Sequence, residues 1–210
     1  MGKALIAIIV IVVILLLGCL LVFGQYVSVK NTLVSKSESV KAAWSQVDIV
    51  LQRRADLIPN LVETVKGYAQ QEVTVFGDIA KARSALLSAG SPQDKIAANG
   101  QLDGAIGRLL VVVENYPQLK SNENFLRLQD ELAGTENRIA VERKRYNDTL
   151  KDYNTYVQQF PSSFFAGIAG FKPNEAYFEA APASREVPKV NFSAPTTAAP
   201  QATPQPAPAH

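Results

Sequence analysis

An unbroken apolar run near the amino terminus constrains this chain more than any other feature. Of the 20 residues from position 4 to position 23, 19 are apolar and the exception is Gly18. A helix over this run is roughly 30 Å long, which matches the hydrocarbon thickness of a bilayer. Because a helix satisfies its own backbone hydrogen bonds, the run predicts a membrane anchor over residues 1–25 rather than a buried core helix.

Three fates are open for this apolar segment. An uncleaved signal anchor is favoured, because the run is longer than the core of a cleaved signal peptide and no A-x-A site follows it. A lipoprotein is the alternative, because residues 16–19 resemble a lipobox that would be cut before Cys19. Against that alternative, residues 20–23 continue the apolar run. Simple secretion is the third fate.

The orientation of the anchor follows from two opposing signals. Lys30, Lys36 and Lys41 follow the run and Lys3 precedes it, so the positive-inside count leans toward a cytoplasmic body. A long domain, however, is translocated largely regardless of its charge. The Pro/Ala/Thr-rich carboxyl-terminal region is also more typical of the envelope than of the cytosol. We therefore expect a single-pass anchor and a body outside the cytoplasm.

The body shows helical periodicity and almost no alternating strand pattern. No proline interrupts residues 4–58, so the membrane helix is expected to continue into the body as one rod. Pro59 is expected to bend or restart that rod, because proline is best tolerated in the first turn of a helix. The apolar residues of the rod recur at seven-residue steps, at Tyr26, Leu33, Val40 and Val47.

Three further helices are predicted. The second ends near Pro92, the third covers residues 93–115, and the fourth covers residues 122–159. Three glycines in the third helix predict close packing against a neighbouring helix, and they lack the spacing of a phosphate-binding loop. These glycines are Gly100, Gly104 and Gly107. The apolar stripe of the fourth helix recurs every seven residues, at Phe125, Leu132, Ile139, Tyr146, Tyr153 and Phe160.

These patterns predict an all-α fold in which the transmembrane helix continues into an antiparallel bundle of about four long helices, over residues 26–160. Residues 161–192 are expected to form an irregular segment that docks onto the bundle. Residues 193–210 are rich in proline, alanine and threonine and are expected to be disordered. The docking residues are expected to be the aromatic and apolar side chains Phe171, Tyr177, Phe178, Val190 and Phe192.

A series of short motifs runs in order through residues 26–192. The motifs are AWS at 43–45, QRRADLIPNLV at 52–62, VKGY at 65–68, YPQLK at 116–120, TENRIA at 135–140, RYN at 145–147, YN at 153–154, FPS at 160–162 and GF at 170–171. Together they resemble the LemA family of bacterial membrane proteins.

This resemblance implies one amino-terminal membrane helix followed by an α-helical body, in the bacterial cytoplasmic (inner) membrane. It implies no agreed catalytic role. It points to functions in the envelope and to a membrane metallopeptidase as a partner. The Pro/Ala-rich tail is an extension that the resemblance does not lead us to expect.

The sequence contains few of the residues and motifs that catalysis commonly uses. The formal net charge is +2, whereas nucleic-acid-binding domains are usually strongly basic, so no nucleic-acid partner is expected. The only histidine is His210 in the tail, and the only cysteine is Cys19 in the apolar run. The sequence contains neither a G-x-S-x-G nor an H-E-x-x-H motif. We therefore predict no catalytic, cofactor-binding or metal-binding residues, no cofactor, and no enzyme activity.

Two polar groups within the motifs allow two interpretations. They could form interhelical hydrogen bonds and ion pairs that set the register of the bundle, or they could form a recognition surface for a partner protein. One group comprises Gln52, Arg53, Arg54, Asp56 and Asn60, and the other comprises Glu136, Asn137, Arg138, Arg143, Tyr146 and Asn147.

The function expected from this sequence is that of a membrane-anchored scaffold or interaction protein of the bacterial envelope. Its expected partners are the lipid bilayer, other copies of itself, and a membrane metallopeptidase or another envelope protein. Copies anchored in parallel could self-associate as a coiled coil along exposed apolar stripes. The alternative is a ligand-sensing bundle that signals through a partner.

Overall fold

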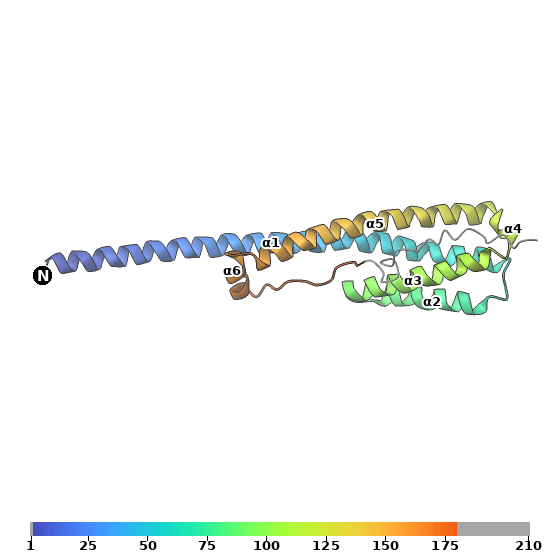
Figure 1. Ribbon diagram of the computed structural model, residues 1–210, viewed down its shortest axis with the longest axis horizontal. Helices are drawn as coiled ribbons and strands as arrows, with labels where there is room; N and C mark the ends of the chain where they lie inside the picture. Colours follow the sequence, from blue (N-terminus) through green and yellow to red (C-terminus); the bar gives the residue numbers. More distant parts are fainter. Residues whose placement is uncertain (1, 180–210) are drawn as a thin grey trace, which may run out of the picture. The chain divides into compact units, whose positions relative to one another are not determined.

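The computed structural model describes residues 2–179, so Val190, Phe192 and the predicted tail lie outside the described residues. The chain divides into a unit at Met1–Phe178 and a second unit at Glu179–His210, and the first unit contains the helices described here. The all-α fold predicted from the sequence is confirmed, and residues 2–179 contain no strand. The helices are α1 (Gly2–Lys66), α2 (Val73–Ser88), α3 (Pro92–Val113), α4 (Pro117–Lys120), α5 (Glu123–Gln158) and α6 (Ser162–Ala169) (Figure 1).

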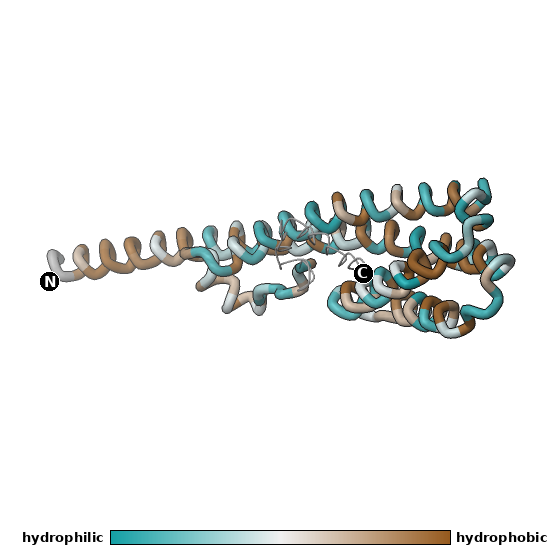
Figure 2. Tube along the Cα trace, turned by 45° about the vertical axis from the view of Figure 1, so that its right-hand side comes forward, coloured by the Kyte–Doolittle hydropathy of each residue, from teal (hydrophilic) through white to brown (hydrophobic). Residues whose placement is uncertain are grey.

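Helix α1 is a single rod of 65 residues, which corresponds to roughly 98 Å. Its apolar part lies at the amino-terminal end (Figure 2). Every described side chain from Leu5 to Phe23 is exposed. Two described helices, α1 and α3, are long and apolar enough to cross a bilayer. The apolar window of α1 has none of its residues buried, whereas 39% of the window of α3 is buried in the unit. The body therefore uses α3 as a core helix, and α1 carries the membrane-length run.

Pro59 does not restart the first helix, so the prediction of a new helix at this point is wrong. Helix α1 continues through Pro59 to Lys66, and the chain turns at residues 67–72 instead. Pro59 has no N–H to donate to the carbonyl of Ala55, which lies four residues earlier. Arg83 of α2 supplies the missing donor, because its Nε lies 2.8 Å from Ala55 O. A contact from another helix thus satisfies the backbone group that the proline leaves unpaired.

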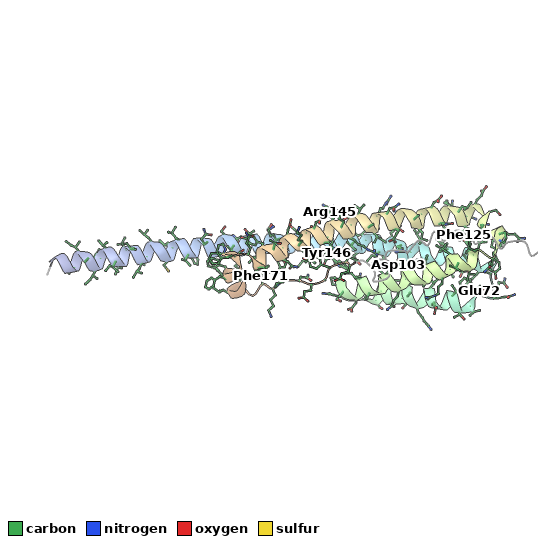
Figure 3. All side chains as sticks on the ribbon, viewed as in Figure 1. Glu72, Asp103, Phe125, Arg145, Tyr146 and Phe171 are labelled. Atoms are coloured by element: carbon green, nitrogen blue, oxygen red, sulfur yellow. The ribbon has the colours of Figure 1, made fainter. Side chains whose placement is uncertain are left out.

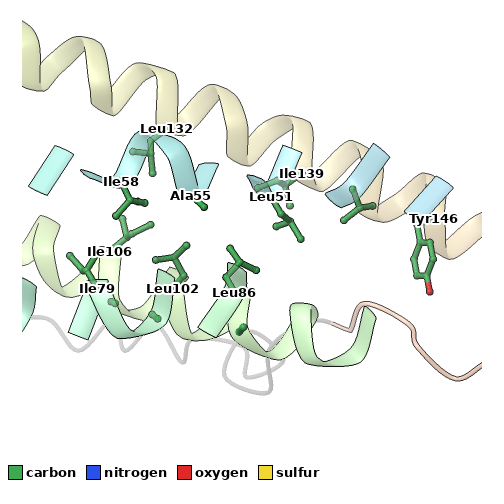
Figure 4. Packing of buried hydrophobic residues seen from close by; sticks show 14 of the residues in the cluster. Leu51, Ala55, Ile58, Ile79, Leu86, Leu102, Ile106, Leu132, Ile139 and Tyr146 are labelled. Carbon is green, nitrogen blue, oxygen red and sulfur yellow. The ribbon is translucent and has the colours of Figure 1, made fainter. Parts of the chain in front are cut away.

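The helices run alternately away from the amino-terminal end and back toward it (Figure 1). Helix α5 packs along α1, α3 packs along α2, and these two pairs face each other across one core. Figure 4 shows this core between the pairs. Its labelled residues are Leu51, Ala55 and Ile58 from α1, Ile79 and Leu86 from α2, Leu102 and Ile106 from α3, and Leu132, Ile139 and Tyr146 from α5.

Capping residues explain where α3 and α5 begin. The Ser91 side chain accepts a hydrogen bond from Asp94 N at 3.1 Å, and Pro92 occupies the first turn of α3. Asn122 Oδ1 accepts from Phe125 N at 3.0 Å at the start of α5. Both starts lie within one residue of the positions predicted from the sequence.

Two packing predictions are wrong. A Cβ added to Gly100, Gly104 or Gly107 would meet no atom within 4 Å, so these glycines do not serve close helix packing. The stripe of α5 is buried from Phe125 to Tyr153, but Phe160 follows the helix and is 83% exposed. The α5 periodicity therefore describes the core only as far as the helix itself extends.

The segment after α5 is more regular at its start than the sequence analysis predicted. The chain passes the cis peptide Phe160–Pro161 and forms the two-turn helix α6. Helix α6 ends at Gly170, whose φ of 79° is in the left-handed region that favours glycine. Residues 171–178 then run without regular secondary structure along α5.

Candidate functional site

A cluster of charged side chains lies between three helices of the bundle. Arg54 of α1 is 5% exposed, and its Nη1 lies 2.5 Å from Asp103 Oδ1 of α3 and 2.7 Å from Glu136 Oε2 of α5. Asn99 adds a second contact from α3, because Arg54 Nη1 donates to Asn99 Oδ1 at 3.3 Å. Arg143 of α5 completes the cluster, with its Nη2 3.9 Å from Asp103 Oδ2. Two guanidinium groups thus face two carboxylates, which ties α1, α3 and α5 together.

The sequence analysis identified only part of this cluster. It named Arg54, Glu136 and Arg143, and the structure brings these three together. It missed Asn99 and Asp103, whose spacing of four residues places both on one face of α3. That spacing was the available signal. Of the other polar candidates on these two helices, Tyr146 is buried and Asn147 is half-buried, and the rest are exposed, namely Gln52, Arg53, Asp56, Asn60, Asn137 and Arg138.

An apolar groove begins at the charged cluster and continues between α3 and α5, which we call the α3–α5 groove. Its inner part is a cavity of about 220 Å³ and its outer part is a cavity of about 340 Å³. The two parts share Leu110 and Gln129. The inner part is lined by Arg54, Leu61, Ile106, Leu110, Gln129, Leu132, Ala133 and Glu136, and the outer part by Leu110, Val113, Glu114, Lys120, Phe125, Leu126 and Gln129.

An aromatic cluster lies on the other side of the charged cluster, and Figure 3 shows Asp103 between Tyr146 and Phe125 along the bundle. The rings of Trp44, Tyr146 and Phe178 contact one another with centroid separations of 5.3–6.0 Å. The guanidinium carbon of Arg143 lies 5.1 Å from the centroid of the Phe178 ring. Burial raises the pKa of Tyr146, and the neighbouring Tyr177 adds to this increase.

Amide side chains on α5 hold residues 171–178, which we call the strap. Asn147 Nδ2 donates to Phe178 O at 2.8 Å, and Phe178 N donates back to Asn147 Oδ1 at 3.0 Å. Asn154 makes the same two-way contact with Asn174, at 2.7 and 2.8 Å. Each asparagine therefore pairs with the strap backbone through both a donor and an acceptor.

A tyrosine of α5 adds a third contact to the strap. Tyr153 OH donates to Lys172 O at 2.9 Å, and burial raises the pKa of this phenol. The sequence analysis predicted that this part of the chain docks through Phe171, Tyr177 and Phe178. All three pack against the core, but the hydrogen bonds from α5 also set the register of the strap.

Residues 2–179 contain no group of three or more His, Cys, Asp or Glu side chains that could hold a metal ion. The charged cluster is neutral in formal charge, with two arginines against one aspartate and one glutamate. Its chemistry is therefore that of ion pairing and hydrogen bonding.

This chain is similar to known proteins over most of its length. A family model described as LemA family matches residues 43–192. The chain belongs to the LemA family. The matched residues of this LemA-family chain include the charged cluster, the α3–α5 groove and the strap, and they begin after the apolar run.

Relatives of this LemA-family chain include proteins named for the magnetosome. Magnetosome proteins MamQ 1 and MamQ 2 of Paramagnetospirillum magneticum are each 31% identical over 179 residues, with 73% of this chain and 65% of the relative covered. Protein LemA of Metamycoplasma hominis is 24% identical over 136 residues, with 64% of this chain and 62% of the relative covered. This chain thus spans slightly less than two thirds of the length of these relatives.

Proposed function

We propose that this LemA-family chain is a membrane-anchored, non-enzymatic scaffold of the bacterial envelope that presents its bundle to protein partners. The observation that carries the proposal is the unbroken path of α1 from the exposed apolar run into the bundle core. A continuous helix joins the apolar run directly to the bundle, so the bundle is held at a defined distance from the end of that run. Holding a partner site in a defined place is the task of a scaffold.

The α3–α5 groove supports protein binding. Its walls are largely apolar, and Leu110 and Leu126 remain 36% and 45% exposed. Such a groove suits the apolar face of an amphipathic helix. We propose a membrane metallopeptidase or another envelope protein as the source of this helix.

Self-association is proposed through the membrane-proximal part of α1. Val27 and Val34 lie one heptad apart and are 39% and 44% exposed. Copies anchored in parallel could bury these side chains against each other as a short coiled coil. In this proposal the anchor remains uncleaved in the inner membrane and the body lies outside the cytoplasm. A lipoprotein attached through Cys19 is the alternative, and the intact mass of the mature protein distinguishes the two.

A photocrosslinking experiment in native membranes tests the scaffold proposal. A photoreactive amino acid at Leu126 is expected to capture a discrete partner, which mass spectrometry then identifies. Val141 is the matched control, because it is also an exposed apolar residue of α5, at 64% exposure, and does not line the groove. The Leu110→Glu substitution is expected to abolish the crosslink at position 126. Equal crosslinking at both positions, or none at position 126, would overturn the proposal.

The inner cavity favours a second candidate function, the binding of a small ligand. Arg54 is one of the residues that line the 220 Å³ cavity, and its Nε is buried and has no hydrogen-bond acceptor among the described residues. A small molecule with an apolar body and one acceptor group would suit this site. A saturable thermal shift in a screen of envelope metabolites, absent in Leu132→Trp, would favour ligand sensing over scaffolding.

A further inference from the structure

Helix α6 turns two of its three large apolar side chains away from the bundle, while the third, Phe165, packs against the core. Phe164 and Ile168 lie four residues apart on one face and are 63% and 62% exposed. Ser162 and Ala166 lie on the opposite face and are buried at 4% and 1% exposure. The helix thus buries small residues on one face and leaves Phe164 and Ile168 facing the surroundings on the other. Water alone would favour the reverse arrangement.

Helix α6 packs against α1 and α5, and local hydrogen bonds close both of its ends. Ser162 Oγ donates to Gln159 O at 2.7 Å, and Ser163 N donates to the same carbonyl at 2.8 Å. At the other end of α6, Phe171 N donates to Ala166 O at 3.0 Å. Phe164 and Ile168 therefore face outward from a helix whose two ends are both fixed by hydrogen bonds.

Helix α6 lies at the level where the apolar run of α1 ends. The ring of Phe165 packs edge-to-face on Tyr26 of α1, with the centroids 6.2 Å apart. Tyr26 follows Phe23, the last residue of the run, by three positions, which is about 4.5 Å along the helix. Figure 1 shows α6 beside α1 at the end of its unaccompanied stretch. In a bilayer crossed by residues 4–23, this level is the interface, where tyrosine is enriched.

The charge pattern around α6 also fits a lipid surface. No charged residue occurs between Phe160 and Phe171, a stretch that includes the whole of α6. The exposed Lys172 directly follows this neutral stretch, and the exposed Lys30 lies on α1 four residues beyond Tyr26. Apolar side chains bordered by lysines are the pattern of segments that lie in the headgroup region of a membrane containing anionic lipids.

We propose that α6, together with Phe160, inserts into the leaflet from which α1 emerges. This inference rests on the membrane anchor of the proposed function. Phe160, Phe164 and Ile168 would lie at the boundary between headgroups and acyl chains, with Phe160 contributing a side chain that is 83% exposed. Two contacts with the same bilayer, through α1 and α6, restrict the tilt of α1 and its rotation about its own axis. The bundle would then always present the same face to partners at the membrane.

Depth-dependent fluorescence quenching tests this insertion on the full-length protein. The single native tryptophan is replaced by Trp44→Phe, and one tryptophan is introduced by Phe164→Trp or, separately, by Ile168→Trp. The variants are checked for helix content and reconstituted into vesicles of phosphatidylcholine and phosphatidylglycerol that carry bromine at a chosen depth. Leu15→Trp reports on the anchor, and Val111→Trp is the control at an exposed apolar position of α3, at 69% exposure.

Insertion predicts a blue-shifted emission at positions 164 and 168 that is quenched most by bromine near the headgroups. Leu15→Trp should be quenched most by bromine near the chain ends, and Val111→Trp by neither. Quenching at position 15 without quenching at 164 and 168 would overturn the insertion of α6 and leave the anchor standing. A blue shift at 164 without quenching would also overturn it, because a protein neighbour would then cover α6. Absence of quenching at position 15 would overturn the anchor and this inference with it.

Discussion

The contact between Arg83 and Ala55 allows a quantitative test of how α1 accommodates its proline. Arg83 Nε donates to Ala55 O at 2.8 Å, and this carbonyl has no helical donor because Pro59 lacks an N–H. Ala55 itself is fully buried, so the carbonyl has poor access to water once Arg83 is gone. Hydrogen bonds from charged donors contribute about 1.5–3 kcal/mol. We expect Arg83→Met to lower the free energy of unfolding by about 2 kcal/mol, or roughly 4–8 °C in Tm.

A double-mutant cycle separates this contact from the loss of a positive charge. The Pro59→Ala substitution restores an N–H four residues after Ala55, so the helix can satisfy the carbonyl without help from α2. Pro59→Ala alone should stabilise the protein, because an interior proline costs about 3 kcal/mol relative to alanine. In that background Arg83→Met should cost less than about 1 kcal/mol, which leaves a coupling of at least about 1 kcal/mol.

The assay is chemical denaturation of the full-length protein in mild detergent, followed by the loss of helical circular dichroism. Lys81→Met is the matched control, because Lys81 is an exposed basic residue on the same helix. It should change the free energy of unfolding by less than about 0.5 kcal/mol. If Arg83→Met costs the same with Pro59 and with alanine at that position, the carbonyl contact is not the reason that α1 tolerates proline.

Four other properties of the bundle can be tested by substitution. Arg54→Met leaves two carboxylates without their main partner and should lower the free energy of unfolding by about 2–3 kcal/mol, measured by chemical denaturation. This loss is smaller than that expected for a fully buried ion pair, because both carboxylates are partly exposed. Asn154→Ala should release the strap locally, which hydrogen exchange would detect as faster exchange of the Asn174 amide, with little change in Tm. Burial raises the pKa of Tyr146, so its contribution to stability is complete below the unfolded pKa of about 10 and is lost as pH rises through the higher folded pKa. Tyr146→Phe should therefore reduce the fall in Tm at alkaline pH. Gly104→Ala should raise the free energy of unfolding by about 0.5–1 kcal/mol in the same denaturation assay, because the added Cβ meets no atom within 4 Å, and a loss of stability would contradict the open space described around α3.

Residue periodicity accounts for the parts of the fold that could be predicted. The stripe of α5 could be read from the sequence because its buried residues repeat every seven positions from Phe125 to Tyr153, over about eight turns. The same reasoning failed at Phe160, because a stripe does not show where the helix beneath it ends. It also failed at Gly104, because a small residue on a helix is compatible with a close neighbour and equally with open space.

The candidate site was predictable only on the helices that carry distinctive polar motifs. Arg54 and Glu136 stood out in the sequence, and the structure places them 2.7 Å apart. Asp103 lies in an apolar, glycine-containing helix with no motif around it, and its four-residue spacing from Asn99 was the available signal for a polar face on that helix. Contacts between residues about 50 and 80 positions apart depend on how the two helix pairs face each other, which local patterns do not encode.

The sequence by itself determined the membrane-length run, the helical class and the faces of the long helices, because hydrophobicity and period are local properties of the chain. Tertiary structure decided the rest. It determined that α1 continues through Pro59, because the missing hydrogen bond is supplied by Arg83 from α2. It also placed the outward apolar face of α6 beside Tyr26, because the position of a short helix depends on the elements that hold it rather than on its own composition.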